Sequence, residues 1–250
     1  MIAIVCALPL EAKEFIRLFS LIQKSTTTPF SVYESDEVVL VVTGMGSLRM
    51  QCGVATLMGL YDPKTFDMVI NMGVCAGSKE SFVIGDIVMI SSLKGERQRC
   101  YPDMIARHPF CEGALLSVET PFAGDIPKDH CVDMEGVAFF QAASLFVSPS
   151  RLIVVKIISD YGNPDVVIEN SKAYLPKVSD TIKEWIVNAK KLFVRSPLLS
   201  EQQEEKLRSI AQEKKLSSYQ THDERKKILS LVYGLGMSFD DAVEKGFDVE

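Results

Sequence analysis

Residues Arg151 to Asp160 have the sequence RLIVVKIISD, the most β-branched run of the chain. β-Branched side chains favour strands, and a largely apolar run is typical of a strand buried on both faces. The sequence therefore predicts a central strand over 151–159, with Asp160 at its carboxyl end.

Short apolar runs alternate with segments of helical periodicity on either side of this strand. The further expected strands are 2–7, 30–33, 38–43, 66–71, 86–90 and 115–118, and the expected helices are 11–19, 48–61, 136–146 and 178–193. The runs at 30–33 and 38–43 are separated by a short polar turn and predict a hairpin. Strands alternating with helices indicate an α/β protein, here a three-layer αβα sandwich.

The chain becomes richer in charge after Pro197. Three residue pairs there have the spacing of a capping box, in which a hydroxyl and an acid or amide three residues later satisfy free N–H groups of a first helical turn. These pairs are Ser200/Gln203, Thr221/Glu224 and Ser238/Asp241. We predict one domain over 1–195 and a helical extension over 196–250, which could pack on the core, cover a site, extend a dimer interface or recruit a partner.

Composition excludes several classes of function. The 250 residues carry 27 basic and 33 acidic side chains, a net charge of −6, which argues against sequence-independent nucleic-acid binding. The longest run without a charge, 136–150, is too short for the ~20 residues of a membrane span. The amino terminus lacks the basic segment of a signal peptide, so we expect a cytoplasmic protein.

Cysteine usage fits a reducing compartment, because the 6 cysteines contain no CxxC pair and most lie in apolar runs. A zinc site formed by Cys100, His108, Cys111 and either His130 or Cys131 is conceivable, but its spacing fits no standard pattern. No metal site is expected.

Three acidic residues lie beside apolar strands rather than on charged surfaces: Glu11, Glu135 and Asp160. Ligands of open α/β sheets collect at the carboxyl ends of strands, and a shielded carboxyl group can have a raised pKa and act as a general acid. Each acid also has a structural explanation. Glu11 and Glu135 could be first-turn acids favoured by a helix dipole, and Asp160 could be a capping or turn residue.

A small-residue segment, 73–78 (GVCAGS), follows an expected strand and predicts a loop where backbone can approach a ligand closely. It matches neither GxGxxG nor GxxxxGK[ST], so it does not indicate a dinucleotide site or a P-loop. The turn at 43–46 is explained by strand-to-helix geometry. The three histidines, His108, His130 and His222, lie outside any nucleophile elbow, so no Ser-His-Asp triad is predicted.

Six segments taken in order carry a family resemblance: IVCALPLEAKEF (4–15), VVTGMGS (41–47), FDMVINMGVCAGS (66–78), VIGDIVMIS (83–91), VDMEGVAFFQAA (132–143) and VVKIISDYGN (154–163). Residues 1–193 thereby resemble the purine nucleoside phosphorylase superfamily. They are most similar to its nucleosidase branch, the 5′-methylthioadenosine/S-adenosylhomocysteine nucleosidases, with the futalosine hydrolases close by. The resemblance implies a central mixed sheet in the sandwich, and it does not extend to the C-terminal helices.

The resemblance implies a role for each acid. Asp160 would be the general acid that protonates purine N7 as the N-glycosidic bond breaks. Glu135 would bind the ribose hydroxyls, with Met134 packed against the sugar, and Glu11 would orient and deprotonate the attacking water. Protonating a poor leaving group is worth ~10²–10⁴ in rate, and carboxylates stabilise the oxocarbenium character of the sugar. Such a reaction requires no metal or redox cofactor.

The remaining implied site residues surround the base and the sugar. Phe122 would stack on the purine, although a core role for Phe122 is the alternative, and the Ala123 backbone would read the purine edge. Val74, Cys75, Ala76 and Ser159 complete the expected substrate-binding set, listed here in chain order. The expected partners are a purine nucleoside and a second copy of the chain, since a neighbouring subunit often completes the 5′ pocket in this family.

Two departures from the family bear on the nucleophile. Phosphorylases commonly have an arginine where this chain has Asn71 and a small hydroxyl residue where it has Val74, which favours water over phosphate. Val74 also replaces a serine of the nucleosidases, and Lys156 stands where an arginine is usual. A phosphorylase and a non-catalytic nucleoside-binding protein are the alternatives to a hydrolase.

Overall fold

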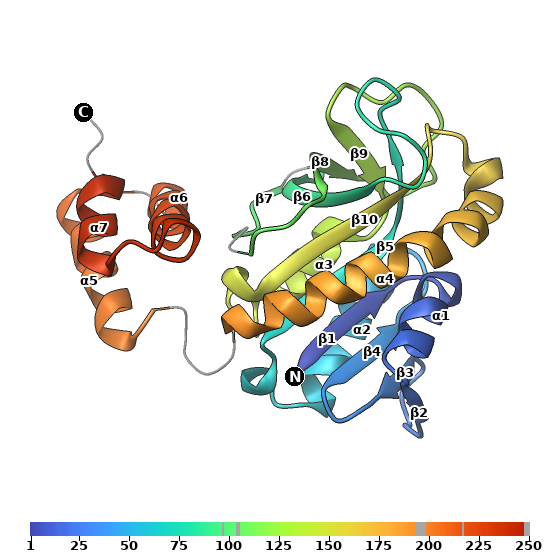
Figure 1. The fold of residues 1–250 in the computed structure, drawn as a ribbon, viewed down its shortest axis with the longest axis horizontal. Helices are drawn as coiled ribbons and strands as arrows, with labels where there is room; N and C mark the ends of the chain where they lie inside the picture. The colour runs from blue at the N-terminus through green and yellow to red at the C-terminus, as the bar shows by residue number, and fades with distance from the viewer. Residues whose placement is uncertain (97, 104–105, 194–198, 217, 248–250) are drawn as a thin grey trace.

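The computed structural model of the protein describes residues 1–96, 98–103, 106–193, 199–216 and 218–247 (Figure 1). The strands are β1 (Ile2–Cys6), β2 (Ile22–Lys24), β3 (Ser31–Glu34), β4 (Val38–Val42), β5 (Met68–Gly77), β6 (Ile87–Lys94), β7 (Arg99–Cys100), β8 (Cys111–Ser117), β9 (His130–Asp133) and β10 (Leu152–Asp160). The α-helices are α1 (Pro9–Leu18), α2 (Ser47–Leu60), α3 (Gly136–Ser144), α4 (Val167–Phe193), α5 (Glu201–Glu213), α6 (Ser218–Leu229) and α7 (Phe239–Phe247).

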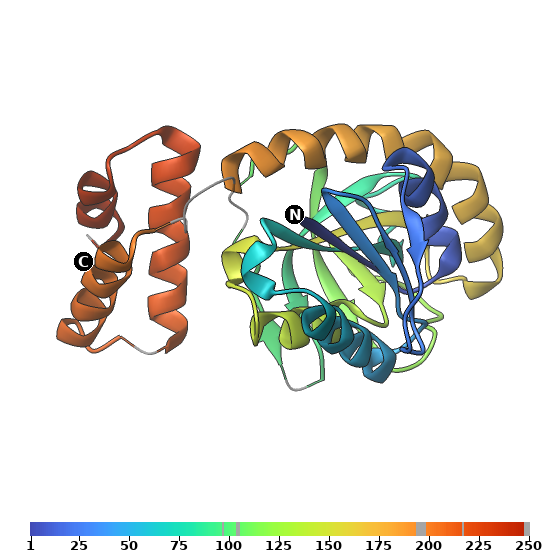
Figure 2. The same cartoon turned by 90° about the horizontal axis from the view of Figure 1, so that it is seen from below.

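The strands form one mixed sheet, in the order β10-β6-β8-β9-β5-β1-β4-β3-β2, with β7 beside β6. Strand β10 pairs with β5 in parallel and with β6 antiparallel, so β5, β10, β6, β8 and β9 close into a ring. Helices α1 and α4 cover one face of the sheet and α2 and α3 cover the other (Figures 1 and 2). The predicted αβα sandwich with a mixed sheet is confirmed.

Each face of the sheet has its own apolar core. Phe15 and Ile70 belong to the core under α1 and α4, and Leu57 and Phe139 belong to the core under α2 and α3. Burying a side chain of this size contributes roughly 1.5–3 kcal/mol. All residues of β10 are buried, as the Arg151–Ser159 run predicts.

The prediction of a loop at 73–78 is wrong, because β5 continues through Gly77. The small residues are needed for close packing: a Cβ added at Gly77 would lie 2.6 Å from Cδ1 of Ile158 on β10. The turn before α2 is confirmed, and Gly44 and Gly46 adopt positive φ angles of 84° and 98° there. The short strands β2, β7 and β9 were not predicted.

Helix α4 begins at Val167, well before the predicted start at Val178, and Pro176 lies inside it. A proline lacks the N–H that an interior helical position donates, yet α4 continues through Pro176. No helix among the described residues combines the length and apolarity needed to cross a bilayer.

Three α-helices follow the sandwich. Ser200 Oγ accepts from the N–H of Gln203 at 3.2 Å, and Gln203 returns a bond to the N–H of Ser200 at 2.8 Å, so this capping box is confirmed. Ser238 Oγ accepts from the N–H of Asp241 at 3.1 Å at the start of α7. Thr221 lies inside α6, so the helix start predicted there is wrong. The predicted boundary at 195/196 lies outside the described residues.

Candidate active site

A cavity of about 350 Å³ opens where β1, β5 and β10 end. Ligand pockets typically measure ~300–1,000 Å³, so it can hold a small molecule. Nine of the ten predicted site residues line it: Glu11, Val74, Cys75, Ala76, Phe122, Met134, Glu135, Ser159 and Asp160. The tenth, Ala123, is exposed and is not among the lining residues. Sequence positions far apart are thus brought together as the strand-end argument predicts.

The buried Glu11 carboxylate joins the first turn of α1 to β5. Its Oε2 accepts from the N–H groups of Ala7 at 3.0 Å and Leu8 at 2.8 Å, and its Oε1 accepts from the N–H of Val74 at 2.9 Å. A role in capping the first turn of α1 therefore explains the bonds to Oε2, but it does not explain the bond between Oε1 and β5. Burial raises the pKa of Glu11, whereas the charge of Lys156 and the three N–H groups oppose that rise.

Glu135 immediately precedes α3, yet its side chain turns away from the helix. Its Oε1 accepts from the N–H of Gly46 at 2.7 Å, while Asp133 Oδ2 accepts from the N–H of Gly136 at 2.9 Å and caps α3 instead. Burial and then the Asp133 charge raise the pKa of Glu135 to about 7, and Lys156 opposes them. Glu135 is therefore a buried carboxyl group on the cavity wall rather than a helix cap.

Asp160 is held rigidly at the end of β10. Its Oδ1 accepts from the N–H groups of Gly162 and Asn163, each at 2.8 Å, as a turn residue would. The hydroxyl of Ser159 lies 2.8 Å from Asp160 Oδ2 and 3.1 Å from the carbonyl oxygen of Cys75. These contacts fix the carboxyl group while it lines the cavity.

The half-buried Phe122 ring lines the cavity and also packs against a small cluster that contains Ile126 and Val132. Two positions further along the same loop, Gly124 donates its N–H to the carbonyl oxygen of Gly162 at 3.3 Å. The loop that carries Phe122 therefore lies against the turn after Asp160, and both roles considered for Phe122 are compatible with its position.

The strongest electrostatic feature near the cavity is an ion pair that the sequence argument missed. Lys156 Nζ lies 2.8 Å from Asp133 Oδ2, and both side chains are almost completely buried. Ser117 Oγ donates to Asp133 Oδ1 at 2.6 Å. A lysine within a β-branched run is a usable signal, because a buried charge requires a partner, but the partner depends on the sheet pairing.

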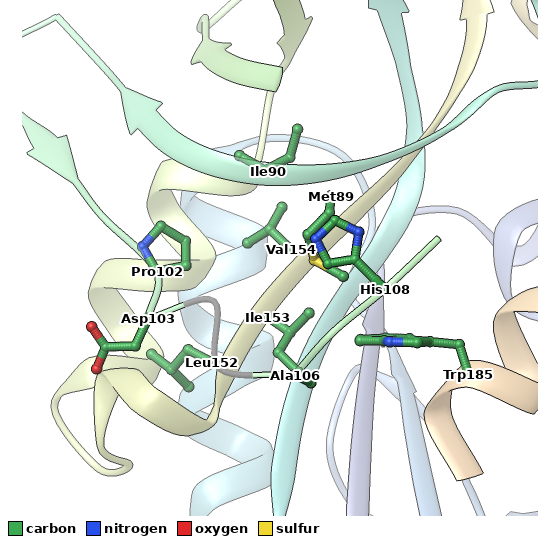
Figure 3. Close-up of a pocket in the computed structure, with 10 residues that line it drawn as sticks. All are labelled: Met89, Ile90, Pro102, Asp103, Ala106, His108, Leu152, Ile153, Val154 and Trp185. Carbon is green, nitrogen blue, oxygen red and sulfur yellow. The ribbon is translucent and has the colours of Figure 1, made fainter. Parts of the chain in front are cut away.

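A second cavity, lined by the residues drawn in Figure 3, lies between β10, β6 and α4 and measures about 10 Å³. This is about the space that one water molecule needs, so the cavity cannot hold a nucleoside. Its His108 ring stacks on Phe110 at 5.8 Å, and Trp185 Nε1 donates to the carbonyl oxygen of Arg107 at 3.0 Å. Within the described part of the chain, no three His, Cys, Asp or Glu side chains form a group that could hold a metal ion.

Comparison with solved structures finds the same fold. A 5′-methylthioadenosine/S-adenosylhomocysteine nucleosidase from Neisseria meningitidis, in complex with methylthio-immucillin-A, aligns with a TM-score of 0.62 and 16% identity over 74% of this chain and 97% of that one. The enzyme of the same name from Colwellia psychrerythraea, in complex with adenine, gives 0.62 and 20% over 75% and 95%. The Arabidopsis thaliana 5′-methylthioadenosine nucleosidase gives 0.64 and 16% over 78% and 96%.

Comparison of the sequence gives a family over the first part of the chain. A search of curated proteins finds no match. Residues 1–117, which contain Glu11 and the strands β1 to β8, match the model of the phosphorylase superfamily. The match covers slightly less than half of the chain, and the solved structures compared above share the fold of the sandwich.

Proposed function

We propose that this protein hydrolyses the N-glycosidic bond of a 5′-modified purine nucleoside, of the 5′-methylthioadenosine or S-adenosylhomocysteine type, and releases the free base. One observation carries the proposal: Glu11, Glu135 and Asp160 line a single nucleoside-sized cavity. The fold around that cavity is shared with structures that are named as nucleosidases of this type.

The three acids divide the reaction between them. The bond between C1′ and N9 breaks as Asp160 donates a proton to N7, so the purine leaves neutral. The water oxygen bonds to C1′, and one water proton passes to Glu11, whose carboxylate is held by three backbone N–H groups. General acid and base steps of this kind each contribute ~10²–10⁴ in rate.

The remaining lining residues orient the substrate. The Glu135 carboxylate accepts from the ribose hydroxyls, and Met134 packs against the sugar. Phe122 stacks on the base, with the Ala123 backbone at its edge. Val74, Cys75, Ala76 and Ser159 form the floor of the site. All of these except Ala123 line the cavity, which supports this arrangement.

Charge supports water rather than phosphate as the nucleophile. The lining residues include the four acids Glu11, Asp133, Glu135 and Asp160 and, among those that the structure describes, no lysine, arginine or histidine. A dianion placed among several carboxylates is repelled strongly in a low-dielectric cavity.

The assembly and setting are part of the same proposal. Met45 and Ile168 line the cavity and yet expose 59% and 60% of their surface, which supports cover by a second copy in a homodimer. We place the enzyme in the cytoplasm, with a catalytic domain over 1–195 and a helical extension over 196–250.

The test is to incubate the protein with 5′-methylthioadenosine and identify both products by mass spectrometry. Adenine together with free methylthioribose is the expected result. Adenine with methylthioribose 1-phosphate, formed only in phosphate buffer, would identify a phosphorylase. Binding without cleavage of this or another purine nucleoside would identify a non-catalytic nucleoside-binding protein.

A further inference from the structure

Lys156 is a buried charge that the proposed reaction does not use. It lies in the middle of β10, and its side chain is among the largest fully buried ones in the protein. Among the described residues, its ammonium group forms an ion pair with Asp133 Oδ2 at 2.8 Å. Asp133 also accepts from Ser117 Oγ and from the N–H of Gly136, so the carboxylate that anchors the ammonium group is itself fixed.

The sheet register places Lys156 beside Glu11. Lys156 pairs with Gly73 of the parallel neighbour β5, and residues in register project from the same face of a sheet. A Cβ added at Gly73 would lie 2.7 Å from Glu11 Oε1. A side chain at position 73 would therefore point at the Glu11 carboxylate. The Lys156 side chain projects from the same face of the sheet as position 73, and it therefore lies beside Glu11.

The bond to Asp133 places the same ammonium group near Glu135. Asp133 ends β9 and stands two positions before Glu135, whose Oε1 is held by the N–H of Gly46. Lys156 thus lies between the carboxylate assigned to the water and the carboxylate assigned to the ribose. Both of these acids line an otherwise largely apolar cavity.

We propose that Lys156 is a positioning residue whose charge, anchored by Asp133, favours the ionised forms of the Glu11 and Glu135 carboxyl groups in this cavity. The catalytic meaning of this inference rests on the proposed function, because Glu11 must be charged to accept a proton from water, and Glu135 must be charged to accept hydrogen bonds strongly from the ribose hydroxyls. An opposite charge at short range favours the ionised form of a carboxyl group, and a like charge disfavours it.

The groups that face Lys156 come from every element packed against it. They are the acids Asp133, Glu135 and Glu11 and the thiols Cys6 and Cys75. Burial raises the pKa of both thiols, so they stay neutral and carry no competing charge. Although burial opposes it, these carboxylates raise the pKa of Lys156, which stays charged throughout the working pH range.

The test compares two variants that break the same ion pair but change charge in opposite senses. Lys156→Met removes the positive charge, so the titration midpoints of Glu11 and Glu135 should rise, by about one pH unit. Asp133→Asn removes a negative charge and leaves Lys156 in place, so the Glu135 midpoint should fall by a similar amount. Lys156→Arg, which keeps the charge, should restore the wild-type midpoints.

The midpoints are measured by carboxyl ¹³C NMR on protein labelled at glutamate, with Glu11→Gln and Glu135→Gln providing the assignments. This measurement needs no turnover, so it decides the inference even when the wild type proves inactive, an outcome that would overturn only the proposed function. With an active wild type, the acid limb of the kcat/KM profile should move in the same directions as the midpoints.

Opposite shifts of the Glu135 midpoint in the two variants support the inference. Shifts in the same direction, or no shift in either, would show that the ion pair is structural only and would overturn it. If Lys156→Met does not fold, the test rests on Asp133→Asn. Its control is Asp133→Glu, which keeps the negative charge. A midpoint that does not fall in Asp133→Asn overturns the inference.

Discussion

Asp160 illustrates at the scale of one residue how a turn can prepare a carboxyl group for acid catalysis. Its Oδ1 is occupied by the N–H groups of Gly162 and Asn163, and both contacts can be made equally well by an amide oxygen. Asp160→Asn should therefore fold normally and bind substrate with little change, while kcat falls by ~10²–10⁴ because N7 receives no proton.

The kcat of Asp160→Asn is measured as adenine release from 5′-methylthioadenosine, and affinity is measured by calorimetry. Asp165→Asn is the matched control, since it removes an exposed acid five positions on that does not line the cavity. The control should retain wild-type kcat. A near-normal rate in Asp160→Asn would remove this residue from the mechanism.

Glu135 should make the stability of the protein depend on pH. Its pKa is raised from the usual 4.5 to about 7 in the folded state, so between these values the folded protein binds more protons than the unfolded chain. Stability is therefore lost as pH rises through that window, by on the order of 3 kcal/mol. Glu135→Gln, which keeps an acceptor for the N–H of Gly46, should remove this loss.

Urea unfolding of the wild type and Glu135→Gln from about pH 5 to about pH 8 measures this effect. The variant should become the more stable protein at the alkaline end, because it carries no buried charge there. Parallel curves for the two proteins would show that Glu135 titrates normally in the fold.

At the scale of the element, strand β5 leaves room for the Glu11 carboxylate, because the residue beside it is Gly73, which has no side chain. A Cβ at Gly73 would lie 2.7 Å from Glu11 Oε1, so Gly73→Ala should displace the carboxylate from the N–H of Val74. We expect kcat to fall by at least about tenfold, because small displacements of a catalytic group are costly.

Gly59→Ala is the control for Gly73→Ala. Gly59 lies in α2, and a Cβ there would meet nothing within 4 Å. Alanine in a helix is favoured over glycine by roughly 0.5–1 kcal/mol, so this variant should be more stable and fully active. Equal kcat values for the two variants would show that Gly73 has no role in positioning the Glu11 carboxylate.

Local signals in the sequence were sufficient for some elements and insufficient for others. The β-branched run before Asp160 predicts β10 from its own residues. The hydroxyl of Ser200 likewise predicts the start of α5. The segment 73–77 looks like a loop locally, and its pairing with β10 and β9 makes it a strand. The four residues of β9 have no distinctive pattern, since their pairing with β5 and β8 defines them.

The features of the candidate site divide in the same way, into those that the local sequence predicts and those that depend on tertiary packing. That Glu11 and Asp160 meet could be predicted, because each follows an apolar strand and the carboxyl ends of strands converge in an α/β sheet. The presence of Glu135 in the same site was implied by the family resemblance. That Lys156 pairs with Asp133 could not be predicted, because it depends on how the sheet closes into a ring. The cavity-lining role of Met45 and Ile168 likewise depends on tertiary packing.

At the scale of the whole molecule, Arg225 joins the C-terminal helices to the sandwich. Arg225 of α6 donates to Asp103 Oδ2 at 3.0 Å and to Glu204 Oε1 of α5 at 2.7 Å, and the Asp103 side chain is fully buried. Arg225→Met should lower the free energy of unfolding by about 1–3 kcal/mol and speed proteolysis between α4 and α5.

Because every residue that lines the large cavity lies between Ala7 and Ile168, adenine release by Arg225→Met should stay near the wild-type rate. Arg208→Met is the control. Arg208 lies 4.0 Å from Glu205, and both side chains are mostly exposed, so its loss should cost less than about 1 kcal/mol. Loss of activity in Arg225→Met alone would instead assign the helices a role in the site.

The measurement that tests the central claim most directly is the rate of adenine release from 5′-methylthioadenosine as phosphate is varied from zero upward. The account predicts a full rate without phosphate and no increase when phosphate is added, because acidic side chains line the cavity and, among the described residues, no lysine, arginine or histidine does. A rate that is absent without phosphate and rises with its concentration would contradict the account.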